Sequence, residues 1–275
     1  MDCSSNIFFS LLESKGSQAA FNYMASCMPD YVYKFISLTE ERNNNDVSEN
    51  EKRFKSLSEN KVWFSLRTAL NDPYEMKGLY FDRSRLLQYG ISQEYVDQLE
   101  EIMYNTALAS FTGNIEDNLP MWAHYSNNHQ GYAIKYRVTN KHVIRPVIYE
   151  EKIINASNIL INFLHNAIEF EKTQENETQK ALDLFSTILQ FSFLIKHSSW
   201  SYEKEYRIVY PLIHDKSVGY GLNVDTSVFG FEPIAIYSGI NCNDVHKQRL
   251  QGIARELGIE FYCCKQSNTK FTVVE

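Results

Sequence analysis

Glycine and proline are scarce in this chain, with 11 glycines and 6 prolines among 275 residues. Neither a Gly-x-Gly-x-x-Gly run nor a Gly-x-x-x-x-Gly-Lys-Ser/Thr run occurs, which excludes the phosphate-binding loops built on those motifs. The low content of both residues also argues against a disordered chain. Hydrophobic residues make up 44% and aromatic residues 14% of the sequence, so a chain of this length can bury a sizeable core.

An excess of basic residues is also lacking, because the formal net charge is -7. Non-specific binding to nucleic acid or to a membrane surface needs a basic field, so the overall charge disfavours both, while a local basic groove stays open. The apolar run at 7–12 is short and is flanked by Asp2 and Glu13. It predicts neither a signal peptide nor a membrane span.

Cysteine is sparse and odd in number, with five residues in all. This count fits a reducing compartment better than a disulfide framework, so we expect a cytoplasmic protein without a membrane partner. Cys263 and Cys264 are adjacent and would point to opposite faces of a strand, which favours core packing over a shared zinc site.

The order of apolar patterns predicts an α+β fold in a single domain, residues 1–275. Expected strands lie at 31–36, 62–65, 107–111, 203–210, 233–239 and 259–264, and a hairpin joins 132–136 to 143–149. Expected helices include 48–59, after a polar loop at 43–46, and 243–257. We therefore predict a central mixed or antiparallel sheet flanked by helices, with a helical hairpin inserted at about 155–197.

The stretch at 200–210 puts three ionisable groups into an apparent buried strand. With period 2, Glu203, Glu205 and Arg207 share one face of that strand. Desolvating an isolated carboxylate is prohibitive, so this row must be paired, solvated in a cleft, or both. A structural ion pair and a functional cleft are both consistent with it.

Two further motifs carry candidate site residues. Asn71 and Asp72 precede Pro73, which is strong turn chemistry with or without a ligand. His124 and Tyr125 end a predicted short helix, where His124 is a candidate general base or a hydrogen-bonded structural histidine. The tryptophans each lie beside a motif and could form a stacking platform or core, with a shared pocket slightly favoured: Trp63, Trp122 and Trp200.

Together these motifs resemble a bacterial family named domain of unknown function 2971 (DUF2971). The resemblance rests on 71–75, on 121–125 followed by 131–134, and on 200–207, and its order and spacing extend over about residues 31–240. The family implies no established activity.

The order of motifs is also similar to that of ADP-ribosyltransferases, which use a split mixed sheet. In that resemblance Lys34 and Ser65 lie on the first two strands at the NAD site, and Glu205 preceded by Glu203 begins the late catalytic strand. A carboxylate there could stabilise positive charge at the ribose as nicotinamide leaves. Lys34 replaces the usual Arg or His, and the usual Ser-Thr-Ser run is absent.

The resemblance implies an NAD-using transferase, a toxin or defence effector, with a protein or nucleic-acid acceptor. Its NAD-binding candidates are Lys34, Trp63, Ser65, Asn71, Asp72, Trp122, Tyr125, Trp200 and Arg207, and its catalytic candidates are Glu203, Glu205 and His124. Two other interpretations stay open: a non-catalytic module that binds a nucleotide or a partner protein, and a Mg²⁺-dependent nuclease or hydrolase using Asp72, Glu75, Glu203 and Glu205. No metal is favoured, and oligomeric state is not determined.

Overall fold

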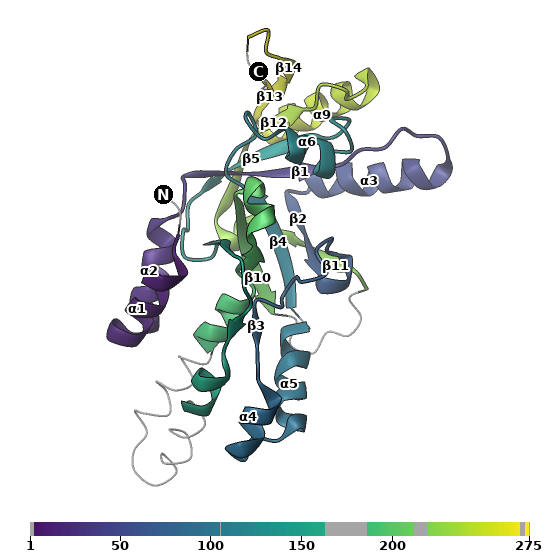
Figure 1. The fold of residues 1–275 in the computed structure, drawn as a ribbon. Helices are drawn as coiled ribbons and strands as arrows, with labels where there is room; N and C mark the ends of the chain where they lie inside the picture. The colour runs from purple at the N-terminus through teal and green to yellow at the C-terminus, as the bar shows by residue number, and fades with distance from the viewer. Residues whose placement is uncertain (1–2, 105, 163–185, 212–218, 270–272, 275) are drawn as a thin grey trace.

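A computed structural model describes residues 3–104, 106–162, 186–211, 219–269, 273 and 274. Its helices surround a mostly antiparallel sheet, so the predicted α+β class is confirmed (Figure 1). The strands are β1 (Tyr31–Ile36), β2 (Lys61–Leu66), β3 (Leu79–Tyr80), β4 (Thr106–Thr112), β5 (Tyr132–Val138), β6 (Arg145–Pro146), β7 (Ile148–Glu150), β8 (Ile154–Asn155), β9 (Ile195–His197), β10 (Glu205–Pro211), β11 (Gly221–Asp225), β12 (Phe231–Ser238), β13 (Glu260–Cys263), β14 (Lys265–Gln266) and β15 (Val273–Val274).

Asparagine caps precede two of the amphipathic helices. Asn43 accepts hydrogen bonds from the first turn of α3, and Asn243 does the same for α9, which ends at Gly258 with a φ of 69°. The α-helices are α1 (Ser5–Lys15), α2 (Ser17–Ser26), α3 (Asn44–Ser58), α4 (Arg83–Gln88), α5 (Gln93–Tyr104), α6 (Leu119–Tyr125) and α9 (Asp244–Leu257), and the 3-10 helices are η1 (Arg67–Ala69), η2 (Ser198–Glu203) and η3 (Thr226–Phe229).

The main core lies between the sheet and the helices α3 and α9. Phe54 and Leu57 of α3 pack there with Val62 and Phe64, the alternate residues of β2. Trp122 of α6 packs in a separate apolar cluster with Phe35 of β1. The sheet is therefore covered on both faces. In Figure 1, α1 and α2 lie to one side of it, and α4 and α5 lie beyond its lower end.

The central sheet divides at β4. The described strands run in the order β11-β2-β4-β1-β5-β12-β13, all antiparallel except β12 and β13, while β10 pairs with all seven residues of β4. On the opposite edge of β4, β2 pairs at Ala107 and Leu108 and β1 pairs only at Thr112. These two strands diverge from a shared edge (Figure 1). Within the described part of the chain, the middle of that edge has no strand partner.

The side chain of Lys34 fills part of this split. Its Nζ donates a hydrogen bond of 3.0 Å to the carbonyl oxygen of Ser110, in the middle of β4. A backbone carbonyl without a strand partner is costly to bury, and an ammonium can replace the missing amide donor. Lys34 thus stabilises the split while its charge stays inside it.

Three sequence predictions need correction. Strand β5 pairs with β1 and β12, and β6 pairs with β10, so the hairpin between 132–136 and 143–149 is not formed, because long-range partners replace local ones. Residues 43–46 are the cap and first turn of α3 rather than a loop. Glu203 ends η2, and β10 begins only at Glu205, because Lys204 takes a left-handed φ of 44°.

The predicted helical hairpin at 155–197 is described only near its ends. Residues 157–162 and 186–192 are helical, and 163–185 lie outside the described residues. The final segment, 195–197, is strand β9, which pairs in parallel with β7. This pairing corrects the helical expectation there.

The backbone is tightly packed at Gly131, just before β5 begins. A Cβ on Gly131 would lie 2.0 Å from the carbonyl oxygen of Ile36, whereas one on Gly252 of α9 meets nothing within 4 Å. Gly131→Ala should therefore destabilise the fold by about 1–3 kcal/mol or more. Gly252→Ala should stabilise it by about 0.5–1 kcal/mol through helix propensity. Urea unfolding of both variants measures the difference, and equal midpoints would contradict the packing at Gly131.

Candidate functional site

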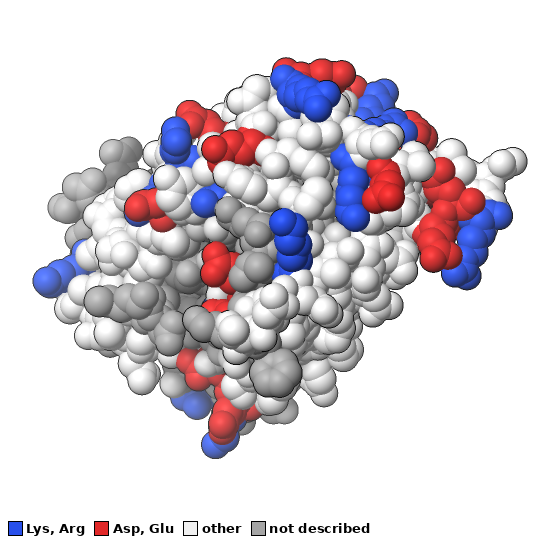
Figure 2. All heavy atoms as spheres, turned by 90° about the horizontal axis from the view of Figure 1, so that it is seen from above, with Lys and Arg blue, Asp and Glu red and all other residues white. Residues whose placement is uncertain are grey.

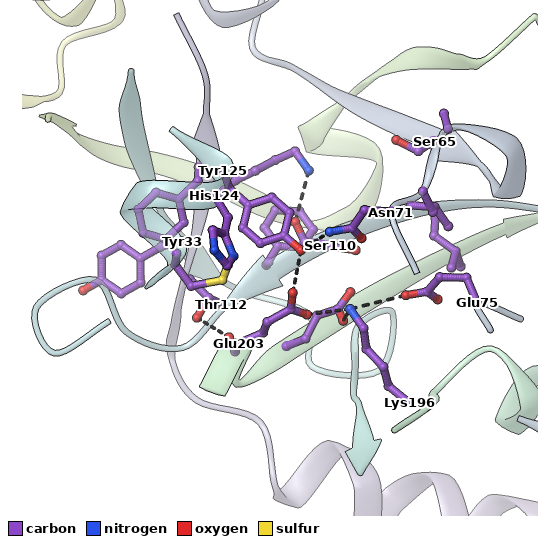
Figure 3. A pocket seen from close by; sticks show the side chains of 18 residues that line it. Tyr33, Ser65, Asn71, Glu75, Ser110, Thr112, His124, Tyr125, Lys196 and Glu203 are labelled. Carbon is purple, nitrogen blue, oxygen red and sulfur yellow. Dashed lines mark hydrogen bonds and ion pairs between the residues drawn. The ribbon is translucent and has the colours of Figure 1, made fainter. Parts of the chain in front are cut away.

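A cavity of about 360 Å³ lies where the sheet divides. All three sequence motifs reach it, although they are far apart along the chain (Figure 3). Of the predicted site residues, its lining includes Lys34, Ser65, Asn71, His124, Tyr125, Glu203 and Glu205. The cavity therefore joins β1, β2, β4, α6, η2 and β10 in one site.

A hydrogen-bonded row crosses this cavity from one motif to the next. Asn71 Nδ2 donates to the Tyr125 hydroxyl at 2.9 Å, and that hydroxyl donates to Glu203 Oε1 at 2.5 Å (Figure 3). Each member has a local cause: Asn71 precedes a turn closed by Asp72, and Tyr125 ends α6, which has a proline in its first turn. The row fixes one oxygen of Glu203.

Behind the row lies a buried ionic network of three carboxylates and two cations. Lys196 Nζ lies 2.5 Å from Glu203, 3.2 Å from Glu205 and 3.3 Å from Glu75. Arg207 binds Glu205 through two nitrogens, at 2.7 and 2.9 Å, and Glu75 at 2.7 Å. All five side chains are at most 5% exposed. Three ionised carboxylates exceed these two cations by one charge.

The two neighbouring glutamates are held differently by this network. Burial would raise the pKa of Glu205, but Arg207 and Lys196 outweigh it and lower the pKa to about 2. Burial raises the pKa of Glu203 above its usual range, despite the attraction of Lys196. Glu205 is therefore the fixed anion of the pair, and Glu203 is the carboxylate more readily protonated.

Lys34 is the further cation at the site. Burial lowers the pKa of its ammonium to about 8, although Glu205 opposes that shift. Lys34 therefore loses its charge at a lower pH than an ordinary lysine, inside the split of the sheet.

His124 lies on the open side of the cavity. It is exposed, and its Nδ1 lies 3.4 Å from the Tyr202 hydroxyl. This position leaves the imidazole accessible to a ligand or acceptor, as the predicted general base requires.

The other five predicted site residues do not line this cavity. Trp122 is fully buried and donates from Nε1 to the Ile115 carbonyl oxygen at 2.9 Å, so it is core. Asp72 accepts from the Tyr74 amide and lines a separate cavity with Trp200, whose ring lies 4.8 Å from Lys196 Nζ. Arg207 is 1% exposed and holds carboxylates. Trp63 lines a neighbouring cavity. The prediction of one pocket with three tryptophans is wrong.

Sequence reasoning missed Lys196 as a site residue and gave Glu75 only to the metal-dependent interpretation. Lys196 lies within the stretch predicted as helix, and its strand β9 has only three residues. The signal that could have found it is charge balance, because Glu203 and Glu205 need more than one cation when buried. The sequence also gave no indication that Tyr33, Ser110 and Thr112 line the cavity.

The described residues offer no ligand set for the Mg²⁺-dependent nuclease or hydrolase interpretation. Among the residues that the structure describes, no group of three or more His, Cys, Asp or Glu side chains is arranged to hold a metal ion. Lys196 and Arg207 already occupy the space between the carboxylates.

Comparison with known families gives one match: residues 121–208 match the model of DUF2971, a protein family of unknown function. This match supports the predicted resemblance to that family. It covers the second and third motifs and begins after the first, at 71–75. No curated protein and no solved structure matched the chain.

Two surface observations bear on partners. In the described part of the chain, no helix has the length and apolarity needed to cross a membrane. Figure 2 shows Lys and Arg beside Asp and Glu on the face drawn, and its described residues form no extended basic field there.

The ionic network predicts a large cost for removing its buried arginine. Arg207→Met leaves Glu75 and Glu205 without their closest cation, so stability should fall by about 3–5 kcal/mol. The control is Arg137→Met, which breaks an exposed pair with Glu232 and should shift the unfolding midpoint far less. Chemical denaturation of both variants checks this, and equal losses would contradict the network's role.

The pKa of Glu205 predicts a specific loss of stability in acid. Its folded value of about 2 lies below its ordinary 4.5, so its contribution is present above pH 4.5 and is lost as pH falls towards 2. Glu205→Gln should flatten the slope of unfolding free energy against pH in this window, by up to about 1.4 kcal/mol per pH unit. Denaturant unfolding at several pH values measures both slopes, and parallel slopes would contradict the assignment.

Proposed function

We propose that this protein cleaves the nicotinamide-ribose bond of NAD and transfers ADP-ribose to an acceptor. The observation that carries the proposal is the split between β1 and β2, where Lys34, Ser65 and the two glutamates border one cavity. This is the arrangement that the resemblance to ADP-ribosyltransferases implies. The unknown function of the matching family neither adds to it nor opposes it.

The cavity fits the reacting half of such a substrate. Its volume of about 360 Å³ lies within the range of small-molecule sites, although it is near the lower end. NAD would supply a glycosidic bond whose cleavage expels neutral nicotinamide and leaves positive charge at the ribose. Glu75, Glu203 and Glu205 of the buried network line this cavity, where a carboxylate can stabilise that charge.

We assign to Glu203 the role of stabilising the positive charge that develops at the ribose. Its two oxygens are oriented by Tyr125 and Lys196, so it needs little reorganisation during the reaction. Glu205 would hold Lys196 and Arg207 in place, and the catalytic role predicted for Glu205 stays a prediction. His124, on the open side, would accept the proton that the acceptor loses.

The acceptor is a protein, a nucleic acid or water in this proposal. Lys196 lines both this site and the separate cavity of about 510 Å³ whose lining includes Asp72 and Trp200. An acceptor reaching the ribose from that side would pass Tyr74, which lines this separate cavity and is 61% exposed.

Glu203→Gln tests the proposal. It keeps size and most hydrogen bonds but removes the anion, so release of nicotinamide should fall by roughly 10²–10³ or more. The control is Glu232→Gln, an exposed glutamate on β12 paired with Arg137. Nicotinamide is measured by chromatography, normalised to folded protein. Unchanged turnover by Glu203→Gln would exclude this residue's role.

Failure of the wild-type protein to release nicotinamide would reject the transferase proposal. NAD binding without turnover would instead indicate the non-catalytic nucleotide-binding module. Both outcomes are read from the same samples by adding a thermal-shift measurement with NAD.

A further inference from the structure

A second cavity of about 720 Å³ opens between β1, β2 and α3. It shares four lining residues with the first cavity, Lys34, Phe35, Ser65 and Tyr125. The two cavities therefore meet at the split in the sheet. A ligand longer than either cavity could occupy both.

This second cavity is basic, although the chain as a whole is acidic. Lys52 and Arg53 line it from α3, Lys61 lines it from β2, and Lys34 lies at the junction. The acidic residue in the lining is Glu49, which pairs with Lys52 at 2.6 Å. Lys61 pairs with Glu59, just outside the lining, at 2.7 Å. With these two pairs neutral, Lys34 and Arg53 still give the cavity a local positive excess, which favours an anionic ligand.

Arg53 has unused hydrogen-bonding capacity in this cavity. Its Nη1 is buried and has no hydrogen-bond partner among the described residues. A buried guanidinium nitrogen without an acceptor is costly, and a phosphate oxygen is a strong acceptor for arginine. The observation points to a phosphate-bearing ligand rather than to a structural role alone.

Two exposed aromatic rings belong to the same cavity. Trp63 is 40% exposed and Tyr220 is 73% exposed. Their segments are adjacent because β11 pairs with β2, and the Leu66 amide donates to the Tyr220 carbonyl oxygen at 2.9 Å. Exposed tryptophan and tyrosine faces are suited to stacking on a nucleobase, worth about 1–3 kcal/mol per base.

We propose that this basic, aromatic cavity binds a nucleoside diphosphate group, with phosphate on Arg53 and the base against Trp63 or Tyr220. The proposal rests on the proposed function in one respect, since it places the adenosine diphosphate half of NAD beside the reacting half. Because ADP lacks the bond that is cleaved, ADP binding can be measured apart from turnover.

The experiment is calorimetric titration of the full chain with ADP, with inorganic pyrophosphate and with adenosine. Arg53→Gln should weaken ADP and pyrophosphate binding by about tenfold or more, as expected for a lost ionic hydrogen bond. Tyr220→Leu should weaken ADP binding and leave pyrophosphate unchanged if Tyr220 holds the base, and Trp63→Leu is the matching variant if Trp63 does. The control is Arg249→Gln, an arginine on α9 that pairs with Glu51 and should bind ADP like the wild type.

Several outcomes overturn the inference. The site is rejected if the wild type does not bind ADP at millimolar concentration. It is also rejected if the wild type and Arg53→Gln bind ADP with equal affinity. Thermal unfolding shows whether the Arg53→Gln variant is folded. If it is not, Tyr220→Leu and Trp63→Leu test the site instead, and unchanged ADP affinity in both variants rejects it. Glu232→Gln should bind ADP within about twofold of the wild type, because this exposed glutamate lines neither cavity.

The two proposals fail separately. ADP binding that depends on Arg53, without nicotinamide release from NAD, would reject the transferase activity and support the nucleotide site. Nicotinamide release from NAD with an ADP affinity independent of Arg53 would support the transferase activity and reject the nucleotide site.

Discussion

The buried ionic network is the constraint on which the candidate site depends. Glu75 comes from a turn, Lys196 from β9, Glu203 from η2, and Glu205 and Arg207 from β10. Burying any one of these charges alone would be prohibitively costly. Ion pairs and hydrogen bonds with the other charges compensate the desolvation cost. The network therefore couples the turn at Glu75 to the consecutive elements β9, η2 and β10, and all of its side chains except Arg207 line the cavity.

The split in the sheet is the second constraint, and it explains why a cavity exists at this point. Strand β4 offers one edge to both β1 and β2, and neither covers its middle. A continuous strand there would close the space between the two faces. Lys34 bridges part of the gap from its side chain, and it borders the cavities on either side.

These two constraints give the site an unequal distribution of charge. Three carboxylates gather on the side of Glu203, where Lys34, Lys196 and Arg207 balance them, while lysine and arginine exceed carboxylate on the side of α3. A substrate with a positive reacting end and an anionic tail would match both sides. The net charge of -7 conceals this local basic region, because exposed acidic residues elsewhere outweigh it.

Local pattern in the sequence determined the elements and their chemistry. Apolar runs predicted β1, β2 and β4, a helix was predicted to begin at Asn243, where α9 is capped, and the motifs at 71–75, 121–125 and 200–207 contributed residues to one cavity. Such features depend on neighbours along the chain, so they can be read without knowing the fold.

Only the tertiary structure decided which charges meet and which tryptophans are core. Lys196 joins Glu75 across more than a hundred residues, Trp122 is buried although its neighbours His124 and Tyr125 face the cavity, and Lys204 turns Glu203 out of the strand. Strand pairing over long distances also replaced the local hairpin expected after β5. The reason is that burial, ion pairing and sheet register are set by partners distant in sequence, whose energies outweigh local preference.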